Sequence, residues 1–167
     1  GDCTADLGGP IVAYDPLADR WLLAQYNGSN SLCFAVSQTA DPLGTYFVYG
    51  FSTTDFPDAF KVGVWPDGYY VSTSELNYSA WAFDRQRMLQ GLTAGSIEAT
   101  GFAENFLLPG DMDGLVAPPP GSPAIYYTFL DDAYHGGIDR LELWAFDVDW
   151  TTPANSTFTM IGTPAVA

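Results

Sequence analysis

The sequence predicts an all-β protein built of three units, each a four-stranded antiparallel meander. Short runs rich in β-branched and aromatic residues follow one another along the chain, separated by Gly, Pro and Asp. One β-hairpin is clear: strands over 60–65 and 69–73 flank Pro66-Asp67-Gly68, where Pro sets φ and Gly accepts a positive φ. A repeat is the third observation, because Trp81-Ala-Phe-Asp84 returns as Trp144-Ala-Phe-Asp147.

The first unit has the simplest pattern. Strands are expected over 10–14, 20–26, 32–37 and 45–51. The segments between them are short and rich in Asp, Asn, Gly and Pro, which form turns. Because short connections join antiparallel neighbours, these four strands are expected to form a meander.

The second unit adds strands over 79–84 and 96–102 to the hairpin described above. Between them, 85–90 is the one convincing helical turn, with Asp84 placed to cap its N-terminus and Gly91 placed to end it. A long connection over 103–122 then leads to the third unit. Its strands are expected over 123–130, 140–147 and 157–162.

The repeat decides between two all-β architectures. Phe34-Ala-Val-Ser37 is assigned to the place that Trp81-Ala-Phe-Asp84 and Trp144-Ala-Phe-Asp147 take in the later units. Units of about 50–60 residues with about four strands each are typical of β-propeller blades. The alternative is a single β-sandwich of about ten to twelve strands. The identical tetrapeptide favours three blades, over residues 1–54, 55–104 and 105–167 of a single domain.

Charge limits the partners. The 167 residues include 20 acidic and 5 basic side chains, for a formal charge of −15. Such a surface repels nucleic acid and anionic membranes, and attracts cations, basic partners or Ca²⁺. No apolar run approaches the roughly 20 residues that a membrane-spanning helix needs.

Cysteine content points to an extracellular or cell-surface location. The two cysteines, Cys3 and Cys33, are expected either to form a disulfide or to remain separate buried thiols. Three Asn-x-Ser/Thr sequons, at Asn27, Asn77 and Asn155, are candidate glycosylation sites. The chain begins with Gly1 rather than Met, so we expect either that a leader is removed or that the chain is part of a longer one.

Asp-rich loops are the first candidate ligand sites. Asp55 and Asp58 precede the first strand of the second unit, and Asp111 and Asp113 precede the first expected strand of the third. Carboxylate oxygens suit Ca²⁺, although only a fragment of a calcium-loop pattern is present. The alternative is that these residues form turns and caps.

A second metal site is conceivable in the third unit. Asp131, Asp132 and His135 lie in one Gly-rich loop, where they would combine oxygen and imidazole ligands. The simpler interpretation is an exposed His at a hairpin tip. Paired carboxylates also serve glycoside hydrolysis, but no Arg is expected in a loop at the channel mouth, which counts against an acidic-sugar substrate.

Several stretches resemble a group of secreted bacterial β-propeller proteins, most of them uncharacterised, and the likeness extends over nearly all of the chain. They are Gly9-Pro-Ile-Val-Ala-Tyr-Asp15, Asp19-Arg-Trp-Leu22, Phe34-Ala-Val-Ser-Gln-Thr39, Asp41-Pro42 and Lys61-Val-Gly-Val-Trp-Pro-Asp-Gly-Tyr-Tyr70. Members of that group usually carry Asp before the first-strand Pro, where this chain has Gly9. The resemblance implies a propeller of more than three blades and implies no substrate.

Three blades do not close a ring, because closed propellers have about four to eight. Open apolar sheet faces drive association, so we expect either further blades or a partner chain. A two-fold pair would give a six-bladed ring, and head-to-tail contacts would give a filament. Three functions compete: a non-catalytic extracellular scaffold or binding module, a glycan-active enzyme using channel Asp residues, and a Ca²⁺-dependent adhesion module.

Overall fold

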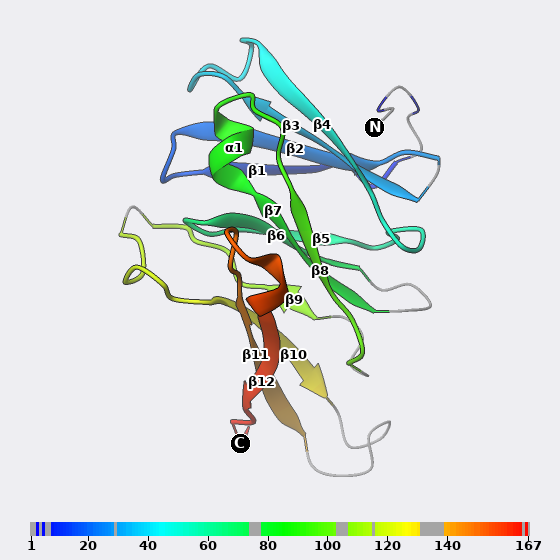
Figure 1. The fold of residues 1–167 in the computed structure, drawn as a ribbon, viewed down its shortest axis with the longest axis vertical. Coiled ribbons are helices and arrows are strands. Elements are labelled where there is room, and N and C mark those ends of the chain that lie inside the picture. The colour runs from blue at the N-terminus through cyan, green and yellow to red at the C-terminus, as the bar shows by residue number, and fades with distance from the viewer. Residues whose placement is uncertain are drawn as a thin grey trace.

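Three four-stranded antiparallel sheets follow one another along the long axis of the molecule (Figure 1). The structure is a computed structural model, and it describes residues 3, 5, 8–28, 30–73, 78–102, 107–114, 116–130, 139–164 and 166. The chain is all-β apart from two short helical segments in these ranges. Within the described part of the chain, the three sheets form an open arc and not a closed ring (Figure 1).

Sheet 1 is a meander in which each strand pairs with the next. Its strands are β1 (Ile11–Asp15), β2 (Arg20–Tyr26), β3 (Ser31–Ser37) and β4 (Tyr46–Ser52). The tight β1–β2 turn places Asp19 at φ 56°, a conformation that Asp tolerates better than most residues. The four strands expected from the sequence are all present.

Sheet 2 contains the hairpin and the helix that the sequence predicts. Its elements are β5 (Lys61–Val64), β6 (Gly68–Thr73), β7 (Ser79–Asp84), α1 (Arg85–Leu89) and β8 (Ser96–Ala99). The hairpin turn closes where the Trp65 amide donates to the Gly68 carbonyl at 3.0 Å. The Asp84 carboxylate caps α1 by accepting from the Arg87 amide.

Sheet 3 differs from the expectation at its first strand. Its elements are β9 (Leu108–Pro109), β10 (Ala124–Leu130), β11 (Arg140–Asp147), the 3₁₀ turn η1 (Pro153–Asn155) and β12 (Thr157–Gly162). The segment over 123–130 was expected to be the first strand, but β9 precedes it and pairs with it. The expectation fails because β9 has two residues, one of them a Pro that cannot donate to a ladder.

The repeat is confirmed at the level of strands, because the three tetrapeptides each end the third strand of their sheet, but the side chains of the first one face the other way. Trp81 and Phe83 face sheet 1, and Phe146 likewise faces the sheet before its own. Phe34 instead faces the sheet that follows, with its ring centroid 4.7 Å from that of Phe83. Phe34-Ala-Val-Ser37 therefore occupies the corresponding strand, but its side chains alternate in the opposite phase, as after a one-residue shift that exchanges the two faces of a strand.

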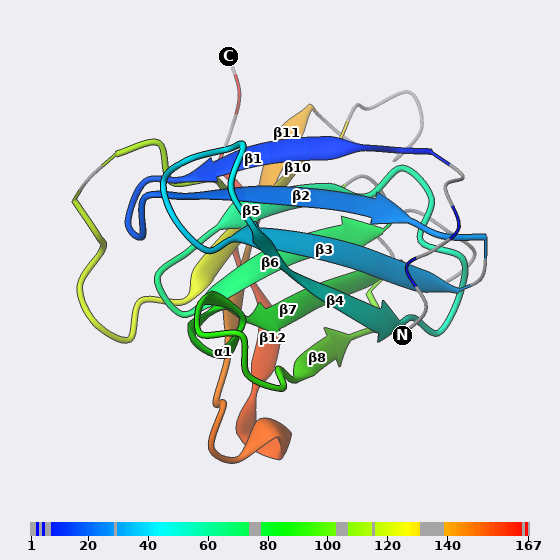
Figure 2. The same cartoon turned by 90° about the horizontal axis from the view of Figure 1, so that it is seen from above.

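Two separate hydrophobic clusters hold the sheets together. The first lies between sheets 1 and 2 and includes Leu22, Phe34, Val71 and Phe83, all almost fully buried. The second lies between sheets 2 and 3 and is built from Tyr70, Ala80, Ala82, Leu107, Ala124, Tyr126 and Phe146. Figure 2 shows sheet 1 lying over sheet 2. Sheet 2 is therefore covered on both faces, whereas sheets 1 and 3 are each covered on one.

Helices in the described ranges are short. None of them has the length and the apolar character that crossing a membrane requires.

Candidate functional site

The acidic residues before β5 lie in an open loop. Asp58 is exposed, its Oδ1 accepts a hydrogen bond from the Ala59 amide, and Asp55 is half-buried. Asp58 lines a hollow of about 220 Å³ together with Tyr26 and Lys61. A cationic Lys in the same hollow neutralises part of the negative charge that a cation would need.

Asp111 has a structural role. Its Oδ1 accepts from the Val64 amide at 2.8 Å, and the Trp65 indole donates to the Gly110 carbonyl at 2.8 Å. These two bonds join the segment after β9 to the end of β5, so Asp111 follows the first strand of its sheet instead of preceding it. Asp113, two residues on, is exposed.

The described residues contain no group of three or more His, Cys, Asp or Glu side chains arranged to hold a metal ion. Asp131, Asp132 and His135, the second candidate metal site, lie outside the described residues. Ca²⁺ binding therefore stays a prediction, and nothing in the described ranges assembles its ligands.

A second hollow, of about 210 Å³, lies beside the β5–β6 turn and is lined by Asp67, Asp147 and Trp150 along with the Pro118–Pro120 run. Burial raises the pKa of the Asp67 carboxyl, while a hydrogen bond from the Tyr70 hydroxyl to its Oδ2, at 2.9 Å, opposes that shift. The Trp150 indole donates to the Asp67 carbonyl at 2.9 Å. The turn between β5 and β6 is thus held by sheet 3.

A buried ion pair joins sheets 1 and 2, and the sequence did not reveal it. Arg85, on α1, donates from Nε and Nη2 to the two carboxylate oxygens of Asp15 at 2.6 and 2.9 Å. The Tyr69 hydroxyl donates to the same carboxylate at 3.0 Å. The Arg85 side chain is 5% exposed and that of Asp15 is fully buried.

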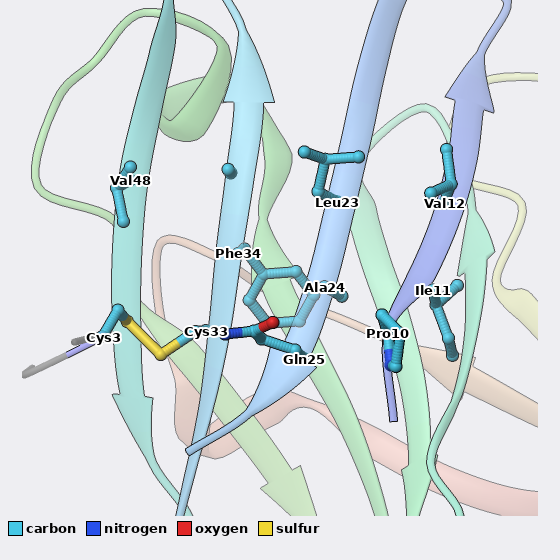
Figure 3. A pocket seen from close by; sticks show the side chains of 11 residues that line it. Cys3, Pro10, Ile11, Val12, Leu23, Ala24, Gln25, Cys33, Phe34 and Val48 are labelled. Atoms are coloured by element: carbon cyan, nitrogen blue, oxygen red, sulfur yellow. A yellow bond between two sulfur atoms is a disulfide. The ribbon is translucent and has the colours of Figure 1, made fainter. Parts of the chain in front are cut away.

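The outer face of sheet 1, turned away from sheet 2, is apolar and open. Val12 pairs with Leu23, Leu23 with Ala35, and Ala35 with Val48, so one row of side chains crosses all four strands. Val12 and Val48 are 64% and 63% exposed. These side chains surround a hollow of about 390 Å³ with the Cys3–Cys33 disulfide at its side (Figure 3).

The outer face of sheet 3 is its counterpart. Leu108 pairs with Tyr127, Tyr127 with Leu143, and Leu143 with Gly162, again across all four strands. Tyr127 is 42% exposed. Phe129, two residues along β10 and therefore on the same side, is 53% exposed. Neither cross-strand row contains a charged residue, in a chain whose formal charge is −15.

The disulfide and the sequons also have defined places. Cys3 and Cys33 are bonded, which attaches the N-terminal segment to β3. Asn155 is exposed in η1, whereas Asn27 is buried and its Oδ1 accepts from the Ser31 hydroxyl. Asn77 lies outside the described residues.

Comparison with models of known protein families, with curated proteins and with solved structures found no match.

The two outer faces are therefore the best-supported candidate site. Monomeric proteins rarely leave large contiguous apolar patches in water unless something binds there. Sequence reasoning anticipated open sheet faces in general terms. It did not identify their residues, because the face to which a strand residue points depends on a register that one residue can reverse.

Proposed function

We propose that this chain is a non-catalytic, extracellular scaffold or binding module made of β-propeller blades, which associates with other chains or further blades through its two outer sheet faces. The observation that carries the proposal is the pair of uncharged apolar rows on the outer faces of sheets 1 and 3. Sheet 2 shows how such a face is covered in this fold, because each of its two faces packs against a neighbouring sheet.

Blade character is supported by how the sheets repeat. Each sheet is a four-stranded antiparallel meander, and the Trp-Ala-Phe-Asp strand has the same orientation in sheets 2 and 3. Successive meanders that pack face to face are the arrangement of propeller blades. The resemblance of the sequence to secreted bacterial propellers agrees with this assignment.

An extracellular location is supported by the disulfide and by the scarcity of Lys and Arg. Disulfides persist in oxidising compartments and are rare in the cytosol. Of the sequons, Asn155 is the one whose exposed side chain in η1 suits glycan attachment. Asn27 would first have to lose its bond with Ser31.

A non-catalytic role is supported by the contacts of three carboxylates: buried Asp15, half-buried Asp67 and exposed Asp111. Asp15 binds Arg85, Asp67 accepts from Tyr70, and Asp111 accepts from the β5 backbone. Each of these groups is occupied by a contact that holds two elements together, so none is positioned as an acid or a base for a bound sugar.

The test measures whether the outer faces are available to a partner. A neutral solvatochromic dye such as Nile red should bind the folded chain, and Val48→Lys or Phe129→Lys should each reduce its emission. Leu43→Lys, which changes a 92% exposed residue in the β3–β4 turn, is the matched control and should leave emission unchanged. Absence of dye binding to the wild-type chain at dilutions where it is monomeric, or turnover of a glycan that is lost in Asp58→Ala or Asp113→Ala, would contradict the proposal.

A further inference from the structure

The two outer faces have opposite positions in the order of the sheets. Sheet 1 uses the face that follows it in the chain order, through Phe34 packed on Phe83 of sheet 2. Sheet 3 uses the face that precedes it, through Tyr126 and Phe146 against Tyr70. What remains open is thus the preceding face of sheet 1 and the following face of sheet 3. In a series of like sheets these are the two faces that meet.

At the hollow, the side chains of the two faces also differ in size in a complementary way, whereas Tyr14 and Trp21 pack together elsewhere on the sheet 1 face. The row on sheet 1 has valines at both ends, with Leu23 and Ala35 between them, and it borders the hollow of about 390 Å³. The row on sheet 3 presents the rings of Tyr127 and Phe129, both more than two-fifths exposed. An apolar cavity of about 150 Å³ holds a benzene ring, so the hollow on sheet 1 has room for an aromatic side chain.

The junction between sheets 2 and 3 already uses this kind of fit. There sheet 2 presents the small residues Ala80 and Ala82 beside Tyr70, and Tyr126 and Phe146 of sheet 3 pack into the space next to that ring. A contact between sheet 3 of one molecule and sheet 1 of another would continue the same arrangement of large side chains on small ones. If the sheet 1 faces of two copies packed against each other, the two hollows would meet and stay unfilled, and the side chains around them would lack van der Waals partners.

Resting on the proposed function, we infer that the partner of these faces is a second copy of this chain, bound head to tail, with Tyr127 and Phe129 of one copy entering the hollow on sheet 1 of the next. Both halves of the contact are carried by one molecule, so no other chain is needed to complete it. Both rows are uncharged, so the contact buries no charged group although each copy carries a formal charge of −15. Distant like charges between copies are screened beyond about 10 Å at 0.1 M salt.

Complementation between two variants of the full chain tests this directly. Val48→Lys disables only the sheet 1 face, and Phe129→Lys disables only the sheet 3 face. Each places an unpaired charge in the contact and should weaken association on the order of 100-fold or more, leaving monomers in sedimentation velocity. Mixed together, the two variants should form a one-to-one heterodimer and nothing larger, because each supplies the face that the other lacks. Both positions are more than half exposed, and a melting curve checks that each variant is folded.

Three outcomes overturn the inference: a wild-type chain that stays monomeric, a single variant that still self-associates, or a mixture that gives no heterodimer. Self-association of one variant alone would indicate a contact between identical faces. Leu43→Lys should assemble as the wild type does. A monomeric wild-type chain that still binds Nile red would refute self-assembly while leaving the proposed function standing, and one that binds no dye would refute both.

Discussion

Replacing Arg85 by Ala should be among the most damaging single changes in the described part of the chain. The Asp15 carboxylate accepts hydrogen bonds from the amides of Leu17 and Ala18, from the Tyr69 hydroxyl, and from two nitrogens of Arg85. Arg85→Ala removes the two that carry charge and leaves a fully buried carboxylate without a cation.

The expected size of the loss follows from these contacts. A hydrogen bond to a charged group contributes about 1.5–3 kcal/mol, and removing one member of a buried ion pair costs about 3–5 kcal/mol. The free energy of unfolding of a domain is typically about 5–15 kcal/mol, so about a fifth or more of it would be lost. For a chain of this size that corresponds to a decrease in Tm of roughly 10 °C. Arg85→Lys keeps the charge but not the two parallel bonds, and should lie between Ala and wild type.

Urea unfolding followed by tryptophan fluorescence measures the effect. The double change Asp15→Asn with Arg85→Met should recover much of the loss, because it removes both charges together. Arg87→Ala, an exposed Arg on the same helix, is the control and should cost under about 1 kcal/mol. If Arg85→Ala costs no more than that control, or the double variant is no better than the single one, the ion pair does not hold sheets 1 and 2 together.

Other predictions concern pH and the junction between sheets 2 and 3. Burial raises the pKa of Asp67, so the stability that its neutral form gives is lost as the pH rises through the folded pKa. Asp67→Asn cannot ionise, so its free energy of unfolding relative to the wild type should be higher at pH 7 than at pH 3. Asp149 has a pKa lowered by backbone amides of the following turn, so Asp149→Asn should lose stability at pH 7 and should match the wild type at a pH below the folded pKa. Unfolding curves at the two pH values check both signs, and a shared sign would contradict the assignment. Tyr126→Phe should cost about 1–2 kcal/mol, measured the same way, because a fully buried hydroxyl loses its backbone carbonyl partners on sheet 2. Gly63→Ala should cost about 1–3 kcal/mol, because its Cβ would lie 2.4 Å from a backbone carbonyl oxygen after β9, whereas Gly95→Ala, with open space around it, should cost little.

The sequence was sufficient wherever a local signal sets the structure. The hairpin around Pro66-Asp67-Gly68 and the helix capped by Asp84 were predicted because turn and cap chemistry acts within a few residues. The positive φ expected at Gly68 is wrong, because Gly68 is already the first residue of β6. The strand β9 was missed because two residues carry no periodicity, and its partner β10 lies beyond a long connection.

The candidate site was predictable in kind but not in its residues. An incomplete ring implies open faces, and the pattern of alternation identifies the two sides of a strand. Which side faces a neighbouring sheet depends on tertiary packing, as Phe34 demonstrates. The pairing of Asp15 with Arg85 joins residues 70 positions apart, and no local pattern encodes such a contact.

The two hydrophobic clusters have a consequence for how the chain unfolds. Sheet 2 belongs to both clusters, whereas sheets 1 and 3 each belong to one. Detaching a terminal sheet exposes a single cluster and leaves the other intact, but disordering the middle sheet exposes both. Each sheet is then stabilised by the sheets next to it, as the units of repeat proteins are. The Asp15–Arg85 pair strengthens the contact between sheets 1 and 2. When another sheet covers an outer face, the terminal sheet beneath it gains a second packed face and no longer unfolds by itself. Unfolding of the whole assembly would then be closer to a two-state transition.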